Sequence, residues 1–419
     1  MTALLSTSKP GPGPLEELNT VVDATVVLIS GLDTSLTNVF QKCSENLDDD
    51  WALLQPSGDK QKDINSLAVA RDASSLIKAH ATKISLFIIN DPFTPTAITG
   101  TLRELIRGPI PAIGTAVQCC HVDLYTRLIR RELAWCCTRV LRELKLLVEK
   151  IPRDGKILSD EQKNGTRGLV AKRGSISTTG LLWSACDDVV RFSNMGIVNT
   201  LVEKVQHLRD TLRDVMEEMK GWGEELEEDD EAEDGTGGED GTGGEDGTGG
   251  ENGLGSGGTS GDGHHGAVAS SELTGYEATQ AMIDSIMDSH SDVRLPAGDP
   301  QRIRERLESS LRRIRLTILL TEAIVKRRLK TLPPLPSRNP TAITSRINEI
   351  MPILSGMPER FGDLAEAFYE LNSSEIDRLM DQCFFDAFAV AELLAKPWEG
   401  QSDAFTTWVA KFQVEIKQA

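Results

Sequence analysis

The sequence lacks the features expected of a membrane, secreted or nucleic-acid-binding protein. No window approaches the roughly 18 apolar residues of a membrane span, and Met1 to Pro14 lacks the apolar stretch of a signal peptide. Lys and Arg number 45 against 64 Asp and Glu, so there is no general basic excess to engage phosphates. Seven cysteines form no regular disulfide framework. These absences predict a soluble intracellular chain. Its charge balance argues against nucleic-acid binding.

Motifs for catalysis are also missing. The chain has no Gly-x-Ser-x-Gly elbow, no phosphate-binding Gly-x-x-x-x-Gly-Lys-Ser/Thr loop, no His-Glu-x-x-His and no Glu-x-x-His. No segment shows the period-2 alternation of a strand from which such loops usually project. We therefore expect no enzymatic activity, no cofactor, no metal and no small-molecule substrate.

One cluster has the composition of a metal site: Cys119, Cys120, His121, Cys136 and Cys137. The apolar stripe around it predicts one continuous helix, on which Cys120 and Cys137 would lie roughly 25 Å apart at about 1.5 Å of rise per residue. Zinc ligands lie within about 2.3 Å of one ion, so the two cysteine pairs could not share it. We expect these cysteines to pack between helices.

Acidity is concentrated in one tract. The net charge of the chain is −19. Fourteen acidic residues and no Lys or Arg lie between Glu224 and Glu251, so this tract carries most of the net charge. Glu-Asp-Gly-Thr-Gly-Gly also occurs there three times in tandem, and a segment of acid and glycine cannot bury enough apolar surface to fold. The tract predicts a disordered acidic Gly-rich linker. The predicted domains are a flexible N-terminus at 1–14, a bundle at 15–223, the linker at 224–268 and a bundle at 269–419.

The rest of the chain shows apolar residues at alternating spacings of three and four, which is typical of amphipathic helices. The longest stripe of the N-terminal half runs from Val122 to Ile151, and another runs from Ile197 to Trp222. Two shorter helices are expected at 341–350 and 358–371. The sequence therefore predicts an all-α fold of two antiparallel helical bundles, with coiled-coil packing of the stripes.

One helix departs from the acidic balance: from Arg302 to Lys330 there are ten Lys or Arg against three Glu. A solvated helix face is the simplest explanation. The alternatives are docking of an acidic partner or of the acidic tract, a nuclear-import signal at 326–330, and DNA binding. The candidate partner-binding residues are Arg312, Arg313, Arg315, Lys326, Arg327 and Arg328.

The tandem repeats offer candidate modification sites. Thr236, Thr242 and Thr248 are each followed three residues later by an acid, the arrangement that acid-directed kinases favour. Phosphorylation there would add negative charge to a segment that is already acidic.

Two short motifs carry a family resemblance. Thr-Gly-Leu-Leu-Trp-Ser-Ala-Cys-Asp at 179–187 and Gly-Asp-Leu-Ala-Glu-Ala-Phe-Tyr at 362–369 are similar to patterns of the cyclin-D-binding, or Grap-and-cyclin-D-interacting, protein family. The second motif has Gly362 where the family tends to have an acid. The motif positions are Gly180, Trp183, Cys186, Asp187, Asp363, Leu364 and Tyr369. Trp183 and Asp187 also fit a purely structural role, as an aromatic anchor and a polar partner one turn later.

The resemblance implies two helical bundles related in shape to vinculin, α-catenin and the talin rod. It also implies binding of D-type cyclins and helix-loop-helix factors, in nucleus and cytoplasm. Together with the residue patterns, it predicts a non-enzymatic regulator of the cell cycle or transcription that binds partner proteins through its helical-bundle surfaces. The alternative is a cytoskeletal or adhesion-type adaptor of vinculin-like architecture.

Overall fold

The protein is built of helices wherever the structure describes it. The computed structural model describes residues 13–44, 64–165, 173–233, 299–335 and 341–418. Within these ranges, extended pairing is limited to one isolated bridge between Gly165 and Arg173. The predicted all-α fold class is confirmed for this part of the chain.

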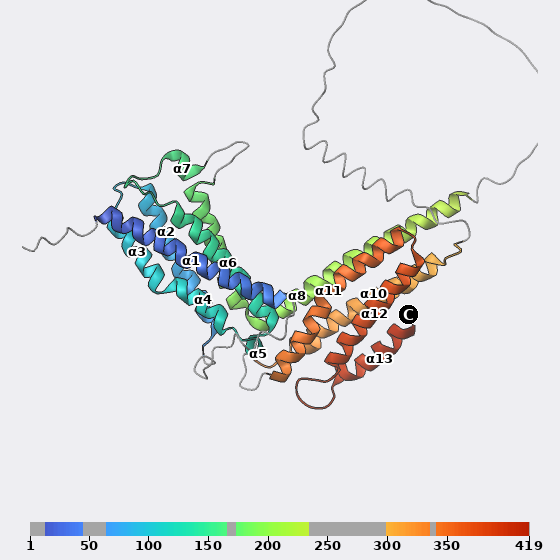
Figure 1. Ribbon diagram of the computed structural model, residues 1–419. Helices are drawn as coiled ribbons and strands as arrows, with labels where there is room; N and C mark the ends of the chain where they lie inside the picture. Colours follow the sequence, from blue (N-terminus) through green and yellow to red (C-terminus); the bar gives the residue numbers. More distant parts are fainter. Residues whose placement is uncertain (1–12, 45–63, 166–172, 234–298, 336–340, 419) are drawn as a thin grey trace, which may run out of the picture. The chain divides into compact units, whose positions relative to one another are not determined.

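The described segments are almost entirely helical (Figure 1). The N-terminal half contains α1 (Pro14–Ser44), α2 (Ser66–Ile89), α3 (Pro95–Arg107), α4 (Pro109–Cys119), α5 (Val122–Tyr125), α6 (Arg127–Glu149), α7 (Asp160–Asn164) and α8 (Ser175–Glu233). The C-terminal half contains α10 (Ile303–Ile324), the π-helix η4 (Val325–Leu329), α11 (Thr341–Tyr369), α12 (Ser373–Ala395) and α13 (Ala404–Gln418).

The contacts group the chain into two compact units. The first unit is Met1–Thr211 with Leu316–Pro358 and Phe385–Gln418, and the second is Leu212–Arg315 with Glu359–Phe384 and Ala419. Both units are discontinuous in sequence, whereas the predicted domains are contiguous, and those domain boundaries stay a prediction. The three candidate threonines, the first twelve residues and the glycine-rich part of the linker lie outside the described residues.

Packing in the first unit follows the apolar stripes. On α1, the side chains of Leu18, Val22 and Ile29 have no exposed surface, and this face packs against α6 and α3. Burying such a side chain contributes about 2 kcal/mol relative to leaving it exposed. Over 18 residues α1 also reaches a mean hydropathy of 1.3, so by length and composition it could cross a membrane, and this corrects the expectation that no window approaches a membrane span.

The stripe from Val122 to Ile151 is not one helix, so that prediction is wrong. The chain breaks at Thr126, whose φ of 77° is unusual for a β-branched residue and ends α5. The Thr126 hydroxyl then accepts a hydrogen bond from the Ile129 N–H and caps α6. An apolar period cannot reveal such a break, because the stripe continues in register on both sides.

That break removes the geometric argument about the cysteines. Cys119 ends α4 and Cys120 follows it, whereas Cys136 and Cys137 lie on α6. All four are buried, and all seven cysteines are free. Within the described ranges, no group of three or more His, Cys, Asp or Glu residues is placed to hold a metal ion.

The two short helices predicted at 341–350 and 358–371 are one helix, α11, which contains Pro352 and Pro358. Proline normally ends or kinks a helix, because it removes one backbone hydrogen bond and clashes with the preceding turn. Here Leu354 and Met357 lie between the prolines and are 1% exposed. Their burial offsets the cost of the prolines and keeps the segment helical.

Helix α8 differs from the prediction in two ways. It bends at Gly196, whose φ of 74° and ψ of 177° are not helical. It also continues to Glu233, into the range predicted as linker. The segment between Gly223 and Gly235 contains no glycine and is rich in Glu, a good helix former, so the helix ends only where the glycine array begins.

Candidate partner-binding groove

The first family motif joins α8 to α2. The Trp183 indole Nε1 donates to the Thr82 hydroxyl over 3.1 Å, and Lys78 Nζ lies 2.6 and 2.7 Å from the two carboxylate oxygens of Asp187. One turn earlier, the Thr179 and Ser85 hydroxyls are 3.0 Å apart in the buried seam. These pairs repeat at helical spacing, so the motif forms a ladder of polar contacts between two helices.

Two other motif positions have different environments. The Cys186 thiol is buried, and burial raises its pKa to about 12. It therefore stays protonated and acts as a small apolar side chain. Gly180 is exposed, and a methyl group added there would contact nothing within 4 Å. The structural role that the sequence suggested for Trp183 and Asp187 agrees with their contacts.

The second motif lies at the end of α11. Leu364 is buried and Asp363 is exposed. The Tyr369 ring meets the Trp222 ring edge-on, with centroids 5.5 Å apart at 69°. Trp222 of α8, the helix that contains the first motif, therefore packs on the second motif through an aromatic pair worth about 1 kcal/mol beyond its buried area.

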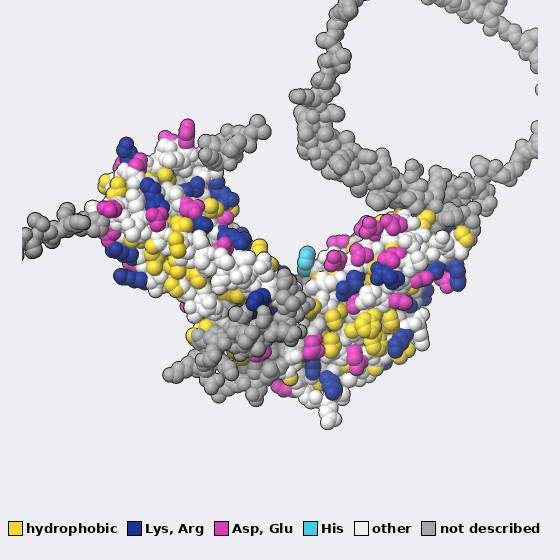
Figure 2. Space-filling view, in the orientation of Figure 1, with side chains coloured by type: hydrophobic (Ala, Val, Ile, Leu, Met, Phe, Trp, Pro, Cys, Tyr) yellow, Lys and Arg dark blue, Asp and Glu magenta, His cyan; other side chains and the backbone are white. Residues whose placement is uncertain are grey.

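The basic helix does not carry its charges in one environment. Arg312, Arg315, Lys326 and Arg327 are exposed. The Arg313 guanidinium lies 5.5 Å from the Phe384 ring centre, and burial lowers its pKa. Figure 2 shows Lys and Arg interspersed with Asp and Glu over the visible face of the helices. The exposed residues retain their candidate status, but they do not form a uniform basic stripe.

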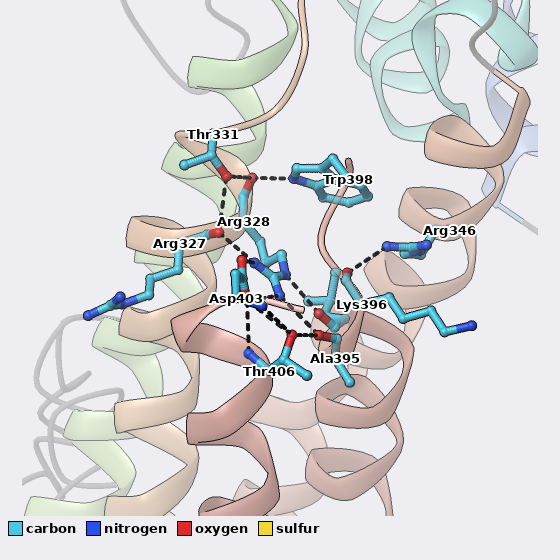
Figure 3. Close-up of polar contacts among 10 residues, drawn as sticks. Arg327, Arg328, Thr331, Arg346, Ala395, Lys396, Trp398, Asp403 and Thr406 are labelled. Atoms are coloured by element: carbon cyan, nitrogen blue, oxygen red, sulfur yellow. Dashed lines mark hydrogen bonds and ion pairs between the residues drawn. The ribbon is translucent and has the colours of Figure 1, made fainter. Parts of the chain in front are cut away.

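Arg328 is not part of that surface, because its side chain is only 1% exposed (Figure 3). Its Nη1 and Nη2 atoms donate to the two Asp403 carboxylate oxygens over 2.7 and 3.0 Å. Its Nε donates to the Leu394 carbonyl over 2.7 Å, and Nη2 also donates to the Ala395 carbonyl. The Trp398 indole N–H donates to the Arg328 carbonyl over 2.7 Å. The guanidinium thus joins η4 to the end of α12 and the start of α13.

This placement corrects the expectation that Arg328 contacts a partner. The Arg328 guanidinium also lies 4.2 Å from the Phe405 ring centre, so one of its faces is covered in addition to its hydrogen-bonding edge. Hydrogen bonds from Arg328 hold the pKa of Asp403 well below its usual range. The sequence contained a signal for the burial of Arg328. Position 328 comes three residues after the buried Val325 and therefore lies beside the apolar stripe of the helix.

A surface cavity lies between α6 and α8, beside the bend at Gly196. It has a volume of about 670 Å³. We call it the α6–α8 groove. It is lined by Glu132, Trp135, Cys136, Arg139, Asp188, Arg191, Phe192, Met195, Thr200, Glu203, Lys204, Gln206, His207 and Asp210.

The centre of the groove is apolar. Trp135 is 45% exposed, and Phe192 and Met195 from α8 are half-buried beside it. Cys136 below them is buried, which raises its pKa to about 11. An aromatic ring that is nearly half exposed in a concavity is the kind of surface that anchors a partner side chain.

One end of the groove carries two guanidinium groups. Arg139 Nη1 and Arg191 Nη2 each donate over 2.9 Å to a different oxygen of Asp188. The Arg139 guanidinium also lies 4.9 Å from the centre of the Trp135 ring. The guanidinium therefore lies over the indole ring, and this cation–π contact stabilises the positions of both side chains.

The other end carries both signs of charge. Glu132 lies 3.1 Å from Arg131 and 3.4 Å from Lys204. Because Arg139 pairs with Asp188 while Glu132 pairs with Lys204, α6 and α8 run antiparallel along the groove. Glu203 is exposed at this end.

Reasoning from the sequence missed this groove. Its lining comes from two helices far apart in the chain, and the bend at Gly196 lies between two of the lining residues, Met195 and Thr200. A signal was present, because Trp135 falls outside the apolar stripe of α6 and so places a large aromatic ring on a polar helix face.

Within the described residues the fold is all-helical, and a concavity lies on its surface between α6 and α8. Residues 70–225, which include the ladder and the groove, match the family model described as Grap2 and cyclin-D-interacting, N-terminal. The match covers less than half of the chain and includes the motif at 179–187, in line with the resemblance that this motif predicted.

One curated relative is an uncharacterised protein of the fission yeast Schizosaccharomyces pombe. It is 25% identical over 159 residues, which cover 38% of this chain and 44% of the relative. The chain therefore aligns with less than half the length of that relative. No solved structure matches this chain, so the vinculin-like architecture stays an expectation from the resemblance.

Proposed function

We propose that this protein is a non-enzymatic regulator that acts by binding a partner protein. In this proposal an apolar side chain of the partner enters the α6–α8 groove and packs on Trp135. The family is described by its interaction with Grap2 and cyclin D, which supports a role in protein binding. The groove lies inside the matched region, which supports it as the place of binding.

The observation that carries the proposal is the exposed Trp135 ring within a cavity of about 670 Å³. Removing an exposed indole from water is favourable, and its neighbours fix its orientation before any partner arrives. A preorganised aromatic anchor loses little conformational entropy on binding, and tryptophan is enriched at the residues that dominate binding energy.

The finer assignments rest on the family. We propose a D-type cyclin as the first partner to test, helix-loop-helix factors as the second, and activity in both nucleus and cytoplasm. Regulation of the cell cycle or of transcription would follow from such partners. No observation on this chain favours the alternative adaptor of the cytoskeleton or of adhesion sites.

The experiment replaces the anchor. Trp135→Ala is expected to weaken binding of a purified D-type cyclin at least tenfold, because it removes the apolar centre of the groove. Isothermal titration calorimetry would measure the affinity, and circular dichroism would check that the fold is retained.

Leu146→Ala is the matched control. Leu146 is on the same helix and is 40% exposed, but it does not line the groove, so its loss should leave affinity unchanged. Equal affinity of the Trp135→Ala and wild-type proteins would overturn the groove as the binding site. Proximity labelling in cells with both variants would extend the comparison to unknown partners.

A further inference from the structure

The charges around Trp135 specify the chemistry of the partner segment. We infer that the α6–α8 groove recognises a protein segment in which a carboxylate side chain lies about one helical turn from an apolar anchor. This inference rests on the proposed function, and it adds to it which side chains the partner presents.

The first argument is the charge balance beside the indole. Arg139 and Arg191 share one carboxylate, that of Asp188, which leaves one positive charge at this end of the groove. Each guanidinium has five N–H donors, and each gives only one of them to Asp188 in these contacts. Arg191 is 74% exposed at its side chain, so its remaining donors can reach an incoming carboxylate.

The second argument is the distance between cation and apolar surface. The Arg139 guanidinium lies 4.9 Å from the Trp135 ring centre. Side chains three or four residues apart on a helix have Cβ atoms about 5–6 Å apart, which matches this spacing. A partner helix could therefore place its apolar anchor on Trp135 and a carboxylate on the two arginines at the same time.

The third argument is the opposite end. Glu132 there is shared by Arg131 and Lys204, while Glu203 is exposed. A long acidic run would bring further carboxylates against Glu203 and would be repelled. The groove thus favours one placed carboxylate over general negative charge, and this argues against the chain's own acidic tract as its occupant.

The test uses three labelled helical peptides that share one leucine anchor. They carry Glu, Gln or Lys four residues from that anchor, and fluorescence anisotropy measures their binding to the full-length protein. The Glu peptide is expected to bind about three- to tenfold more tightly than the Gln peptide, which is the net contribution of one ordinary hydrogen bond and suits a partly exposed site. The Lys peptide should bind most weakly, and raising the salt concentration should narrow the differences.

Reversing the charge at Arg191 should reverse the order of the peptide affinities. With Arg191→Glu, the Lys peptide is expected to bind better than the Glu peptide. Lys145→Glu is the matched control, because Lys145 is an α6 cation outside the groove and its change should keep the original order. A fourth peptide with the sequence of the acidic tract should bind more weakly than the Glu peptide.

The outcomes separate the two proposals. If the Glu, Gln and Lys peptides bind equally, or if Arg191→Glu leaves their order unchanged, carboxylate recognition is wrong while the groove remains a binding site. If the tract peptide binds most tightly, the occupant is general negative charge and the inference is also overturned. If Trp135→Ala leaves binding of the Glu peptide intact, or no peptide binds at about 1 mM, the groove assignment itself fails.

Discussion

Arg328 has charged and carbonyl partners that come from far along the chain. The carbonyl of Leu394 and the carboxylate of Asp403 are 66 and 75 residues away, and together they satisfy a guanidinium that is almost fully buried. The Asp403 side chain is 38% exposed, so loss of this carboxylate is expected to cost less than the roughly 3–5 kcal/mol of a fully buried pair. The stability of this part of the fold therefore depends on Arg328 keeping its partners.

The paired carboxyl predicts a pH dependence. The pKa of Asp403 is lowered in the folded protein, first by hydrogen bonds from Arg328. Its contribution to stability is therefore fully present above the unfolded pKa of about 4 and is lost as pH falls through the lower folded value. Urea unfolding at pH 7, 4 and 3 should show a falling midpoint for the wild type. Asp403→Asn should be less stable at pH 7 and should lose less below pH 4, and parallel curves for the two proteins would contradict this account.

The cysteines give a second prediction for single residues. Cys43 is partly exposed and the other six are buried. Burial raises the pKa of Cys43, and it raises the pKa of Cys137 well above its ordinary value. Only a thiolate reacts readily, so iodoacetamide at pH 8 should modify Cys43 first, and slowly. Mass spectrometry in native buffer and in urea would check this, and rapid modification of Cys137 in native buffer would contradict its burial.

At the scale of the helix, the bend in α8 depends on one glycine. With φ at 74° and ψ at 177°, Gly196 occupies a region that is essentially restricted to glycine. Gly196→Ala should lower the free energy of unfolding by about 1–3 kcal/mol, or straighten α8 and separate Lys204 from Glu132. Urea denaturation and the peptide-binding assay would measure the two effects.

Gly180→Ala is the control within the same helix. Gly180 is helical, and an added methyl group there would contact nothing, so alanine should stabilise the protein by about 0.5–1 kcal/mol. If Gly196→Ala lowers the free energy of unfolding and Gly180→Ala raises it, the backbone conformation at Gly196 matters, and not the loss of a glycine as such. A stabilised Gly196→Ala protein that still binds peptide would contradict the role of the bend.

The elements also show what a sequence can predict. Apolar stripes predict helices because one buried face is enough to fix the period, and this holds for α1, α2 and α12. They cannot predict the break at Thr126 or the continuity of α11 through Pro352, because both depend on packing against other helices. Arg328 shows the same limit for a charged residue, since its partners can be recognised only once α12 and α13 are in place.

For the molecule as a whole, the likeness to the family over residues 70–225 could be predicted and the site could not. The short motif that carries the resemblance forms a ladder between helices, so it reports on how the fold is held together. The groove is assembled from two helices whose lining residues extend from Glu132 to Asp210, and no single stretch of sequence contains it. The net charge of −19 was equally uninformative about the site, because the end of the groove beside Trp135 is positive.

The Arg328 cluster has a consequence for the lifetime of the protein in a cell. The carboxylate that neutralises Arg328 lies just before α13, so a chain shortened before Asp403 would keep the buried cation and lose its counter-ion. Such a product would populate unfolded forms far more often, and chaperones and proteases act on those forms. The cluster therefore makes the stability of the fold depend on the segment from Asp403 onward, and truncation before Asp403 should lower the amount of folded protein in a cell.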